Sequence, residues 1–590
     1  MIKRLSKCIR EYKKDSLLAP LFVAVEVIME VAIPYYMGKL VDNGINGGAN
    51  GEGNMTYIVE IGALLAVFCV ISLLGGVLAG KYAAKASSGF ARNLRHDMYY
   101  NVQNFSFSNI DRFSVSSLVT RLTTDVTNMQ NAYQMIIRIA VRAPLMLIFS
   151  LVMSIRVNAK LSLIFLAVLP FLAGALAFIM SHAHPIFERV FKIYDKLNRV
   201  VSENLSGIRV VKAFVREDHE RKKFNDVSDD IYNNFVKAER LLAFNAPVMQ
   251  LSAYTTMLLI AWFAAKMIVA SGDNAAMGMT TGDLITLMTY AMQILMTLMM
   301  ISMIFVMLTM SRASAERICE VLAEESDLSN KEDPVKEVKD GSIEFDNVGF
   351  SYAKDENKLC LKDVNLKINS GETVGIIGST GSSKTTFVQL IPRLYDVTTG
   401  SVKVGGIDVR DYDIESLRNQ VAMVLQKNVL FSGTIKENLR WGDENATDEE
   451  LVEACKLAQA DGFISEFPDG YDTYIEQGGT NVSGGQKQRI CIARSLLKKP
   501  KILILDDSTS AVDTKTDSLI RKAFARYIPE TTKIIIAQRI SSIEHADKII
   551  VLDGGRIEAV GTHEELLGKD PIYTEVYNSQ MKGGNNNGAK

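Results

Sequence analysis

The sequence has few cysteines and almost no net charge, and both shortages exclude classes of protein. Its six cysteines lie far apart and form no CxxC pair, so neither a disulfide framework nor a zinc site is predicted. The 65 Lys and Arg nearly balance the 67 Asp and Glu, which argues against a nucleic-acid-binding surface. The cysteines are Cys8, Cys69, Cys319, Cys360, Cys455 and Cys491.

A cleavable signal peptide is also missing. Six Lys and Arg between Lys3 and Lys14 precede an apolar stretch that is too long for a signal peptide and lacks a convincing cleavage site. A basic amphipathic opening followed by a first membrane span fits this pattern better.

Long apolar stretches are abundant in the first half of the chain. A helix needs about 20 such residues to cross a bilayer, and six stretches approach or exceed that length. We therefore predict a multidomain membrane protein, with an all-α six-span transmembrane domain and a soluble α/β P-loop domain. The stretches are 17–38, 57–80, 135–155, 161–181, 246–270 and 284–310.

The 590 residues are too many for one core. We expect a transmembrane domain with helical extensions over 1–321, a linker over 322–341, the α/β domain over 342–579 and a disordered tail over 580–590.

Basic residues are concentrated in two of the loops between the spans. Residues 39–56 hold one Lys, whereas 81–134 hold six and 182–245 hold twelve Lys and Arg. The positive-inside rule therefore places the N-terminus, both long loops and the C-terminal domain in the cytoplasm, and we expect the plasma membrane as the location. Apolar residues at 3–4 spacing predict that both loops continue the helices beyond the bilayer.

Four charged residues fall inside or at the margin of the spans. Glu26 and Glu30 in the first span, like Arg138 and Arg142 in the third, are four residues apart and share a helix face. Unpaired ions in lipid are costly, so one interpretation is Glu–Arg pairing between helices. The other is that the two glutamates face a cavity and attract a cationic substrate.

The sixth span carries a row of methionines that recur every three or four residues and so share one helix face. Methionine is unbranched and polarizable, which suits a surface that repacks against different partners or ligands. Packing against neighbouring helices explains the row equally well. The residues are Met288, Met292, Met296, Met299, Met303, Met307 and Met310.

A phosphate-binding loop is predicted in the second half of the chain. A strand-like run, 373–377, leads into a Walker A-type loop and then an apolar helix. Backbone N–H groups of such a loop cradle phosphates, Lys384 reaches the β- and γ-phosphates, and Thr385 can ligate Mg²⁺. The residue before the lysine, Ser383, replaces the usual Gly, and we expect it to hold a helical backbone. The loop comprises Gly378, Ser379, Thr380, Gly381, Ser382, Ser383, Lys384, Thr385 and Thr386.

Two further motifs complete an ATP-binding pattern. The apolar run 502–505 ends at Asp506, a carboxylate suited to a Mg²⁺ site. The run Ser483, Gly484, Gly485 and Gln486 precedes it. Apolar strands that end in Asp are common, but together with the phosphate-binding loop these motifs predict ATP and Mg²⁺ as cofactors.

The chain resembles the ATP-binding cassette (ABC) exporters of the half-transporter type, in which six membrane helices precede one cassette. The resemblance covers essentially the whole sequence. It implies that Tyr352 stacks on adenine and that Gln426 senses Mg²⁺ and contacts the membrane domain. It also implies that segments 106–118 and 206–217 are coupling helices that relay motion to the cassettes.

In the same family, the run from Ser483 to Gln486 is the signature that closes over ATP held by the opposite subunit. Residues 510–513 match the D-loop, which makes Asp513 a nucleotide-site residue by resemblance. The segment 474–479 departs from the family's usual Gly-Glu-Arg-Gly before the signature.

Two other departures bear on catalysis. Asp507 stands where the family has its catalytic Glu, and Gln538 stands where it has its switch His. The shorter Asp withdraws the carboxylate by about one C–C bond, and a positioned general base typically contributes about 10²–10⁴-fold to a rate. Glutamine can hydrogen-bond a phosphate but cannot titrate. We therefore expect Asp507 and Gln538 to be degenerate catalytic positions.

These features favour one subunit of a heterodimeric ATP-driven exporter. Its own Walker site would bind ATP and hydrolyse it slowly, while its signature completes the competent site of a second, different half-transporter. A slow homodimeric exporter with Asp507 as the base is an alternative, and so is an ATP-gated membrane regulator that does not pump. The six spans exclude a soluble nucleic-acid-repair ATPase. Apolar, Met-rich walls favour amphipathic drugs, peptides or lipids as substrates.

Overall fold

The computed structural model describes residues 1–47, 53–271, 279–507 and 512–585, and the chain divides into two compact units. The first unit comprises Met1–Gln103 and Val115–Glu324, and the second comprises Asn104–Ser114 and Glu325–Lys590. The sequence assigned 104–114 to the transmembrane domain, whereas the structure groups these residues with the cassette. The reason is that Ser108, Asn109 and Asp111 form hydrogen bonds with residues of the second unit.

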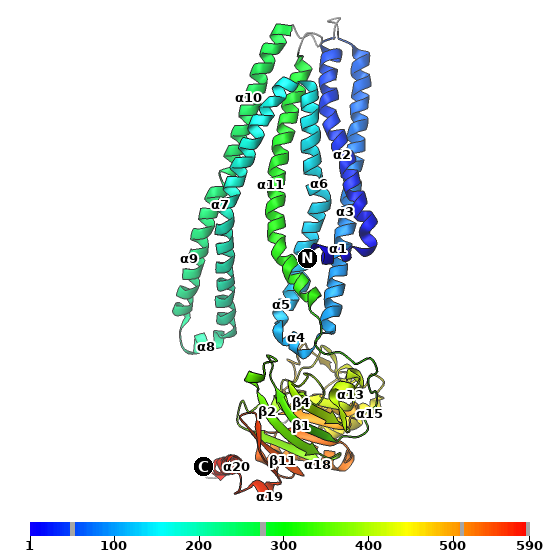
Figure 1. Cartoon of the computed structure of the whole chain (residues 1–590), viewed down its shortest axis with the longest axis vertical. Helices are drawn as coiled ribbons and strands as arrows, with labels where there is room; N and C mark the ends of the chain where they lie inside the picture. The colour runs from blue at the N-terminus through cyan, green and yellow to red at the C-terminus, as the bar shows by residue number, and fades with distance from the viewer. Residues whose placement is uncertain (48–52, 272–278, 508–511, 586–590) are drawn as a thin grey trace. The chain divides into compact units, whose positions relative to one another are not determined.

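The first unit is built from long helices (Figure 1). In the described part of the chain, six helical segments are long and apolar enough to cross a membrane, and they confirm the six predicted spans: Arg10–Ile45, Met55–Gln103, Val115–Val157, Ala159–Ser206, Glu217–Ala270 and Thr281–Ala323. The helices are α1 Ile2–Lys7, α2 Lys13–Lys39, α3 Met55–Gln103, α5 Val115–Thr120, α6 Val126–Val157, α7 Ala159–Ser206, α8 Ile208–Ala213, α9 Glu217–Leu242, α10 Asn245–Ser271 and α11 Thr281–Ala323.

Helices α2 and α3 lie side by side (Figure 1). Small residues make their close approach possible, because Ala19 of α2 and Ala79 and Ala83 of α3 are fully buried. A Cβ atom added at Gly75 would lie 3.3 Å from the backbone of α2, at Phe22 O and Glu26 N. Between apolar helices in a bilayer, such close backbone packing is a main source of association.

The charged residues of the spans form one cluster. Arg142 of α6 donates from Nη1 to Glu26 Oε1 at 2.7 Å and from Nη2 to Glu30 Oε1 at 2.7 Å. Glu26 is buried. Within the described residues, Arg138 has no ion-pair partner. The structure therefore favours pairing over a free acidic face, with Arg142 alone holding both carboxylates.

The second unit contains the P-loop α/β core. A six-stranded sheet has the order β12-β11-β3-β10-β9-β6, in which only β12 is antiparallel to its neighbour. A four-stranded antiparallel sheet has the order β2-β1-β4-β5. The strands are β1 Ile343–Phe350, β2 Leu361–Ile368, β3 Thr373–Gly378, β4 Thr399–Val404, β5 Ile407–Asp408, β6 Val421–Val424, β7 Gly433–Thr434, β8 Tyr474–Ile475, β9 Ile502–Asp506, β10 Thr532–Ile536, β11 Lys548–Asp553 and β12 Arg556–Gly561.

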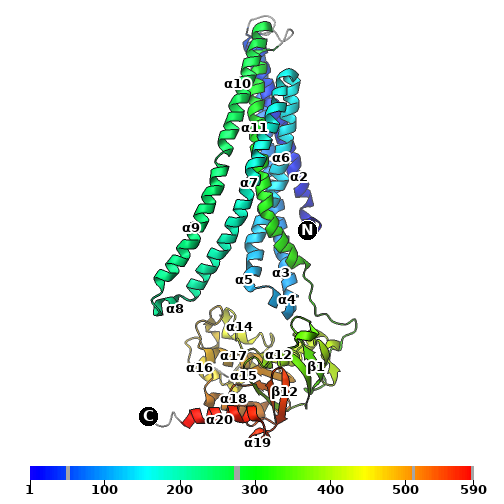
Figure 2. The ribbon, with the colours of Figure 1, turned by 60° about the vertical axis from the view of Figure 1, so that its left-hand side comes forward.

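Both faces of the six-stranded sheet are covered. In β9, Ile502 and Ile504 belong to one apolar cluster and Leu503 and Leu505 to another, because successive side chains of a strand point to opposite faces. This explains why β9 reads as a continuous apolar run. The helices of the unit (Figure 2) are α4 Phe107–Arg112, α12 Lys384–Gln389, α13 Ile414–Gln420, α14 Ile435–Leu439, α15 Asp448–Leu457, α16 Asp461–Ser465, α17 Gly484–Leu497, α18 Thr514–Tyr527, α19 His563–Leu566 and α20 Pro571–Asn585.

The C-terminal helix α20 extends into the segment that the sequence predicted to be disordered from residue 580. Residues 580–585 are helical, and residues 586–590 lie outside the described part. Tyr573 anchors α20 in the core, where it is fully buried. Gln580 holds its far end, since its side chain hydrogen-bonds to the backbone after β10. These contacts outweigh the low helix propensity of the two glycines that follow.

The charge cluster yields a stability prediction. Exchanging Arg142 for Met leaves Glu26 and Glu30 without their cation, which should destabilise the first unit by about 3 kcal/mol. We expect a lower apparent melting temperature of the purified protein in detergent. Arg138→Met is the matched control, and it should have little effect because Arg138 pairs with no carboxylate in the part of the chain that the structure describes. Equal losses in both variants would contradict the pairing.

Candidate functional site

Four segments with predicted site residues meet at one edge of the parallel sheet. The Walker A loop follows β3, Asp507 follows β9, Gln538 comes two residues after β10, and Gln426 comes two residues after β6. These strands are parallel neighbours, and Ile536 pairs with both Ile376 and Asp506. Carboxyl ends of parallel strands share an edge and form the usual ligand-binding crevice of such sheets. The fold therefore brings together residues that are up to about 160 positions apart in the sequence.

The lysine of the Walker A loop forms hydrogen bonds with the backbone of the same loop. Lys384 Nζ donates to the carbonyl oxygens of Gly378 at 2.9 Å and Ser379 at 2.8 Å. Burial lowers the pKa of Lys384, while the nearby Asp506 and Asp507 act in the opposite direction. The ammonium group is therefore held at the start of α12, where phosphates bind in loops of this type.

Ser383 corrects an expectation from the sequence. It caps α12 with φ 70° and ψ 25°, a left-handed conformation and not the expected helical one. Glycine adopts these φ and ψ angles without an energetic penalty, whereas they are unfavourable for residues with a Cβ atom. The left-handed backbone therefore explains why glycine is usual at this position. Ser383 adopts the left-handed conformation under strain.

Thr385 and Asp506 form the pair of oxygens that the sequence predicted for Mg²⁺. Thr385 Oγ1 donates to Asp506 Oδ1 at 3.2 Å. Burial raises the pKa of Asp506, and the neighbouring charge of Asp507 raises it further, against the effects of Thr385 and Lys384. A hard cation beside these oxygens would relieve that unfavourable burial.

The two family departures contact each other. Gln538 Nε2 donates to Asp507 Oδ2 at 2.7 Å, and Gln426 Nε2 lies 3.5 Å from the same oxygen. Asp507 has a left-handed φ of 48°. Burial raises its pKa, and the hydrogen bonds from Gln426 and Gln538 oppose that shift. The carboxylate at the catalytic position is therefore already engaged by the residue at the switch position.

Tyr352 is half exposed beside the Walker A helix. Its hydroxyl shares a 2.9 Å hydrogen bond with that of Thr386, and its ring packs edge-on against Tyr395 at 5.3 Å between centroids. Tyr352 is 52% exposed, and its stacking on an adenine base stays a prediction.

Helix α4 contacts the rest of the cassette through Tyr395, the residue that packs against Tyr352. Tyr395 donates its hydroxyl hydrogen to Asp111 Oδ2 at 2.6 Å. Burial and the Asp111 hydrogen bond both raise the pKa of Tyr395, so the hydroxyl stays protonated. Asn109 and Ser108 add bonds to Glu325 O and Asp327 Oδ2. A continuous set of contacts thus runs from the first predicted coupling helix through Tyr395 and Tyr352 to Thr386.

The signature residues lie on a different helix. Ser483 caps α17, its Oγ accepts from the N–H of Gln486, and the Gln486 side chain accepts from the N–H of Ser483. Ser483 and Gly484 are exposed, while Gly485 and Gln486 are half-buried. The positive end of a 14-residue helix therefore faces outward. In the predicted D-loop, residues 510 and 511 lie outside the described part, and Asp513 caps α18 by accepting from Thr516 N at 3.0 Å.

Sequence reasoning missed two residues near the site. Tyr395 follows the Walker A helix, in a segment with no motif of its own. Gln580 Nε2 donates to Gln538 O at 2.8 Å, and its Oε1 accepts from Ile540 N at 2.9 Å. Only the tertiary structure shows that the C-terminal helix holds the loop that carries Gln538.

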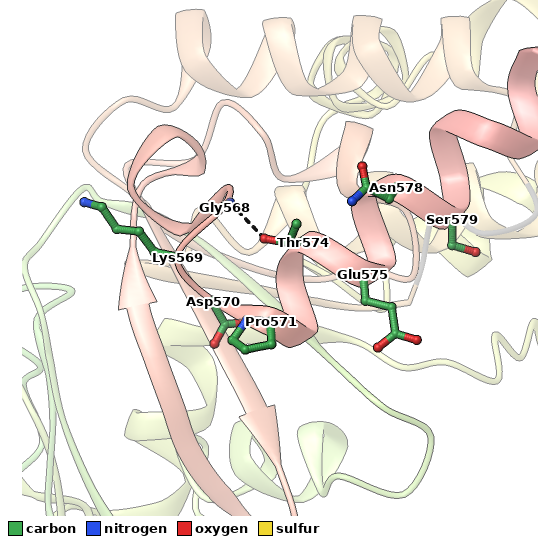
Figure 3. Close-up of a pocket in the computed structure, with 8 residues that line it drawn as sticks. All are labelled: Gly568, Lys569, Asp570, Pro571, Thr574, Glu575, Asn578 and Ser579. Carbon is green, nitrogen blue, oxygen red and sulfur yellow. Dashed lines mark hydrogen bonds between the residues drawn. The ribbon is translucent and has the colours of Figure 1, made fainter.

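A separate surface pocket of about 560 Å³ lies at the start of α20. Gly568, Thr574 and Glu575 are among its lining residues, and Gly568 N–H donates to Thr574 Oγ1 at 2.8 Å (Figure 3). None of the predicted site residues lines it. The pocket is therefore distinct from the nucleotide motifs.

Comparisons with known proteins agree with this architecture. The family model described as "ABC transporter transmembrane region" matches residues 16–299, and the one described as "ABC transporter" matches residues 361–510. An uncharacterized ABC transporter ATP-binding protein of Bacillus subtilis, YfiB, is 37% identical over 98% of this chain and 99% of its own. The putative multidrug export ATP-binding/permease protein YgaD of the same organism is 32% identical over 98% and 99%.

A solved structure shares the fold. A bacterial Atm1-family ABC exporter with ATP bound aligns with a TM-score of 0.81 and covers 97% of this chain and 99% of its own, at 24% identity.

The strain at Ser383 can be tested by substitution. Ser383→Gly should stabilise the cassette by about 0.5–1 kcal/mol, because glycine adopts the left-handed turn without a Cβ clash. We expect a higher apparent melting temperature for the cassette transition of the full chain. Thr380→Gly, in the same loop at a position without positive φ, serves as the control and should not stabilise. A neutral or destabilising Ser383→Gly would contradict the strain.

The contact of Gln580 can be tested by hydrogen exchange. Gln580→Ala removes both bonds to the loop that carries Gln538, so amide exchange over 537–540 should accelerate by roughly tenfold. Strand β10 should keep its protection. Asn578→Ala, an exposed position on the same helix, should leave the loop unchanged. Unaltered exchange in the Gln580 variant would show that α20 does not hold the loop.

Proposed function

The chain belongs to the ABC transporter family, and we propose that it forms one half of a heterodimeric exporter in which its own ATP site hydrolyses slowly. The ABC domain makes it part of an ATP-hydrolysing transporter, and the six apolar helices among its described residues make it a multi-pass membrane protein. The proposal adds that the partner is a different half-transporter and that the cassette faces the cytoplasm of the cell.

One observation carries the proposal: Gln538 Nε2 lies 2.7 Å from Asp507 Oδ2. A general base must accept a proton from the attacking water through a free oxygen. Burial raises the pKa of Asp507, but the Gln538 donor opposes that shift and occupies the oxygen that would accept the proton. Glutamine also supplies no positive charge for the γ-phosphate. Both changes act on the same carboxylate, which favours slow hydrolysis.

Magnesium and ATP fit the chain's own residues. Thr385 Oγ1 and Asp506 Oδ1 are hard oxygen donors 3.2 Å apart, as Mg²⁺ prefers, and the carbonyl oxygen of Gln426 is a third candidate ligand. The metal would supply charge neutralisation of the β- and γ-phosphates. Lys384 and the backbone of the Walker A loop would bind the phosphates, and Tyr352 would stack on the adenine.

The signature supports the division of labour with a partner. Ser483 and Gly484 are exposed at the start of α17, so their helix end is available to phosphates that another subunit holds. Nothing in this motif departs from the family pattern. A homodimer would place the same intact signature over two slow sites, which makes it the alternative assembly, and a non-pumping ATP-gated regulator is the other alternative.

The proposed cargo is an amphipathic drug, peptide or lipid that leaves the cytoplasm. The relative YgaD is a putative multidrug export protein. The lipid bilayer is the surrounding medium in either assembly, and no nucleic acid is involved.

Restoring the two family residues tests the proposal. The double variant Asp507→Glu, Gln538→His should raise the ATPase activity of the purified chain at least about 10²-fold, because a homodimer would then hold two complete sites. The native chain should show little activity until a half-transporter with Glu and His at these positions is added. ATPase rates in nanodiscs measure both effects.

Matched controls separate chemistry from assembly. Asp507→Asn with Gln538→His should stay inactive, because it lacks a base. Ser483→Arg in the restored background should abolish the gain, because it blocks the signature that closes over the ATP held by the opposite subunit. Rapid hydrolysis by the native chain alone would refute the slow site.

A further inference from the structure

The loop that carries Gln538 is held by two helices. After β10 the chain runs through Gln538 and Arg539 into a single 3-10 turn, Ile540–Ser542. Gln580 of α20 contacts the first half of this loop, and α18 contacts the second half. The conformation of the loop therefore depends on tertiary contacts that can be removed one at a time.

Gln580 binds the loop through both ends of its side-chain amide. Its Oε1 accepts from the N–H of Ile540 at 2.9 Å, and its Nε2 donates to the carbonyl oxygen of Gln538 at 2.8 Å. A glutamine amide can serve one donor and one acceptor at the same time, and here both belong to a stretch of three residues. The backbone from which the Gln538 side chain extends is thus fixed by α20.

Helix α20 is anchored independently of this loop. Tyr573 is fully buried, and its hydroxyl shares a 2.7 Å hydrogen bond with His563 Nδ1. Val576 and Tyr577 pack against the apolar cluster that covers one face of the six-stranded sheet. Gln580 comes seven residues after Tyr573 and so lies on the same face of the helix. The helix therefore presents Gln580 to the loop from a fixed position.

Helix α18 holds the second half of the loop. Arg521 Nη1 donates to the carbonyl oxygen of Ser541 at 2.7 Å, and Ser542 Oγ donates to Asp517 Oδ2 at 2.9 Å. Arg521 and Asp517 also form an ion pair at 3.0 Å. These contacts do not involve Gln580, so loss of its amide should release only the first half of the loop.

Asp507 is attached to the strand that precedes the loop. Its backbone N–H donates to the carbonyl oxygen of Ile536 in β10 at 3.1 Å. Gln538 comes two residues after Ile536, and its Nε2 lies 2.7 Å from Asp507 Oδ2. The strand thus places the carboxylate, whereas the contact between the two side chains also depends on the loop backbone.

We propose that Gln580 is a positioning residue for ATP hydrolysis, which fixes the backbone at 538–540 and thereby the direction of the side chain at position 538. In the native chain, it keeps Gln538 on the Asp507 oxygen that would accept a proton. In a Gln538→His background, the same backbone contacts direct a group that assists hydrolysis. The sign expected for the native chain rests on the proposed function, whereas the positioning itself does not.

The experiment measures steady-state ATP hydrolysis by the full chain in nanodiscs, in the native background and in the double variant Asp507→Glu, Gln538→His. Gln580→Ala should raise the native kcat by roughly two- to fivefold, because Gln538 then leaves the Asp507 oxygen for part of the time. It should lower the kcat of the double variant by roughly three- to tenfold, because the switch side chain loses its fixed backbone. The KM for ATP should stay within about twofold in both backgrounds, because the Gln580 side chain bonds to the switch loop and not to the Walker A loop.

Two further variants identify the bond that is responsible. Gln580→Glu keeps an acceptor for the Ile540 N–H, but its ionised carboxylate cannot donate to the carbonyl oxygen of Gln538. It should therefore reproduce both changes in kcat. Asn578→Ala, an exposed position on the same helix, should change neither.

The pH dependence of the native rate is a readout that a loss of stability alone would not move. Burial raises the pKa of Asp507, and the hydrogen bond from Gln538 opposes that shift. Without this bond the pKa rises, so Asp507 stays protonated, and unable to act as a base, up to a higher pH. The acid limb of the native kcat profile should therefore move to higher pH in Gln580→Ala and stay in place in Asn578→Ala.

The outcomes separate this proposal from the slow-site proposal. Opposite changes of kcat in the two backgrounds at unchanged KM would support it. An unchanged or faster double variant, a fall of kcat with an equal loss of ATP binding, or an unmoved acid limb would overturn it. A fall of kcat in both backgrounds at unchanged KM would retain Gln580 as a positioning residue and contradict the blocking role of Gln538.

Discussion

Parallel pairing of β3, β10, β9 and β6 is the constraint on which the ATP site depends. Each strand ends at the same edge, so the Walker A loop, Asp507, Gln538 and Gln426 meet although they are distant in the sequence. The strands stay in register because both of their faces are buried in apolar clusters, and a slip by one residue would exchange those faces. The packing of the sheet therefore determines which side chains meet at this edge.

At that edge, two substitutions that look independent in the sequence become one structural unit. The hydrogen bond between Gln538 and Asp507 joins them, and Gln580 fixes the backbone of Gln538 from the C-terminal helix. A single hydrogen-bonded set therefore includes the base position, the switch position and α20.

The first unit separates charge from its cavity. Arg142 binds both glutamates of α2, and none of the described residues that line the cavity between α6, α7, α9, α10 and α11 is charged. Ions and amphiphiles have opposite requirements in a medium of low dielectric constant, where charges need partners and apolar rings need close contact.

The sequence by itself determined the six spans, the P-loop core and the identity of the motif residues, because hydrophobic length, strand-like runs and glycine-rich loops are local patterns. It could not decide that Arg142, and among the described residues not Arg138, pairs with the glutamates, since helix spacing gives both the same face. It also misjudged two local conformations. Ser383 is left-handed and not helical, and residues 580–585 are helical and not disordered because Gln580 contacts the backbone after β10. Those outcomes belong to tertiary structure, because they depend on which distant groups come within hydrogen-bond distance.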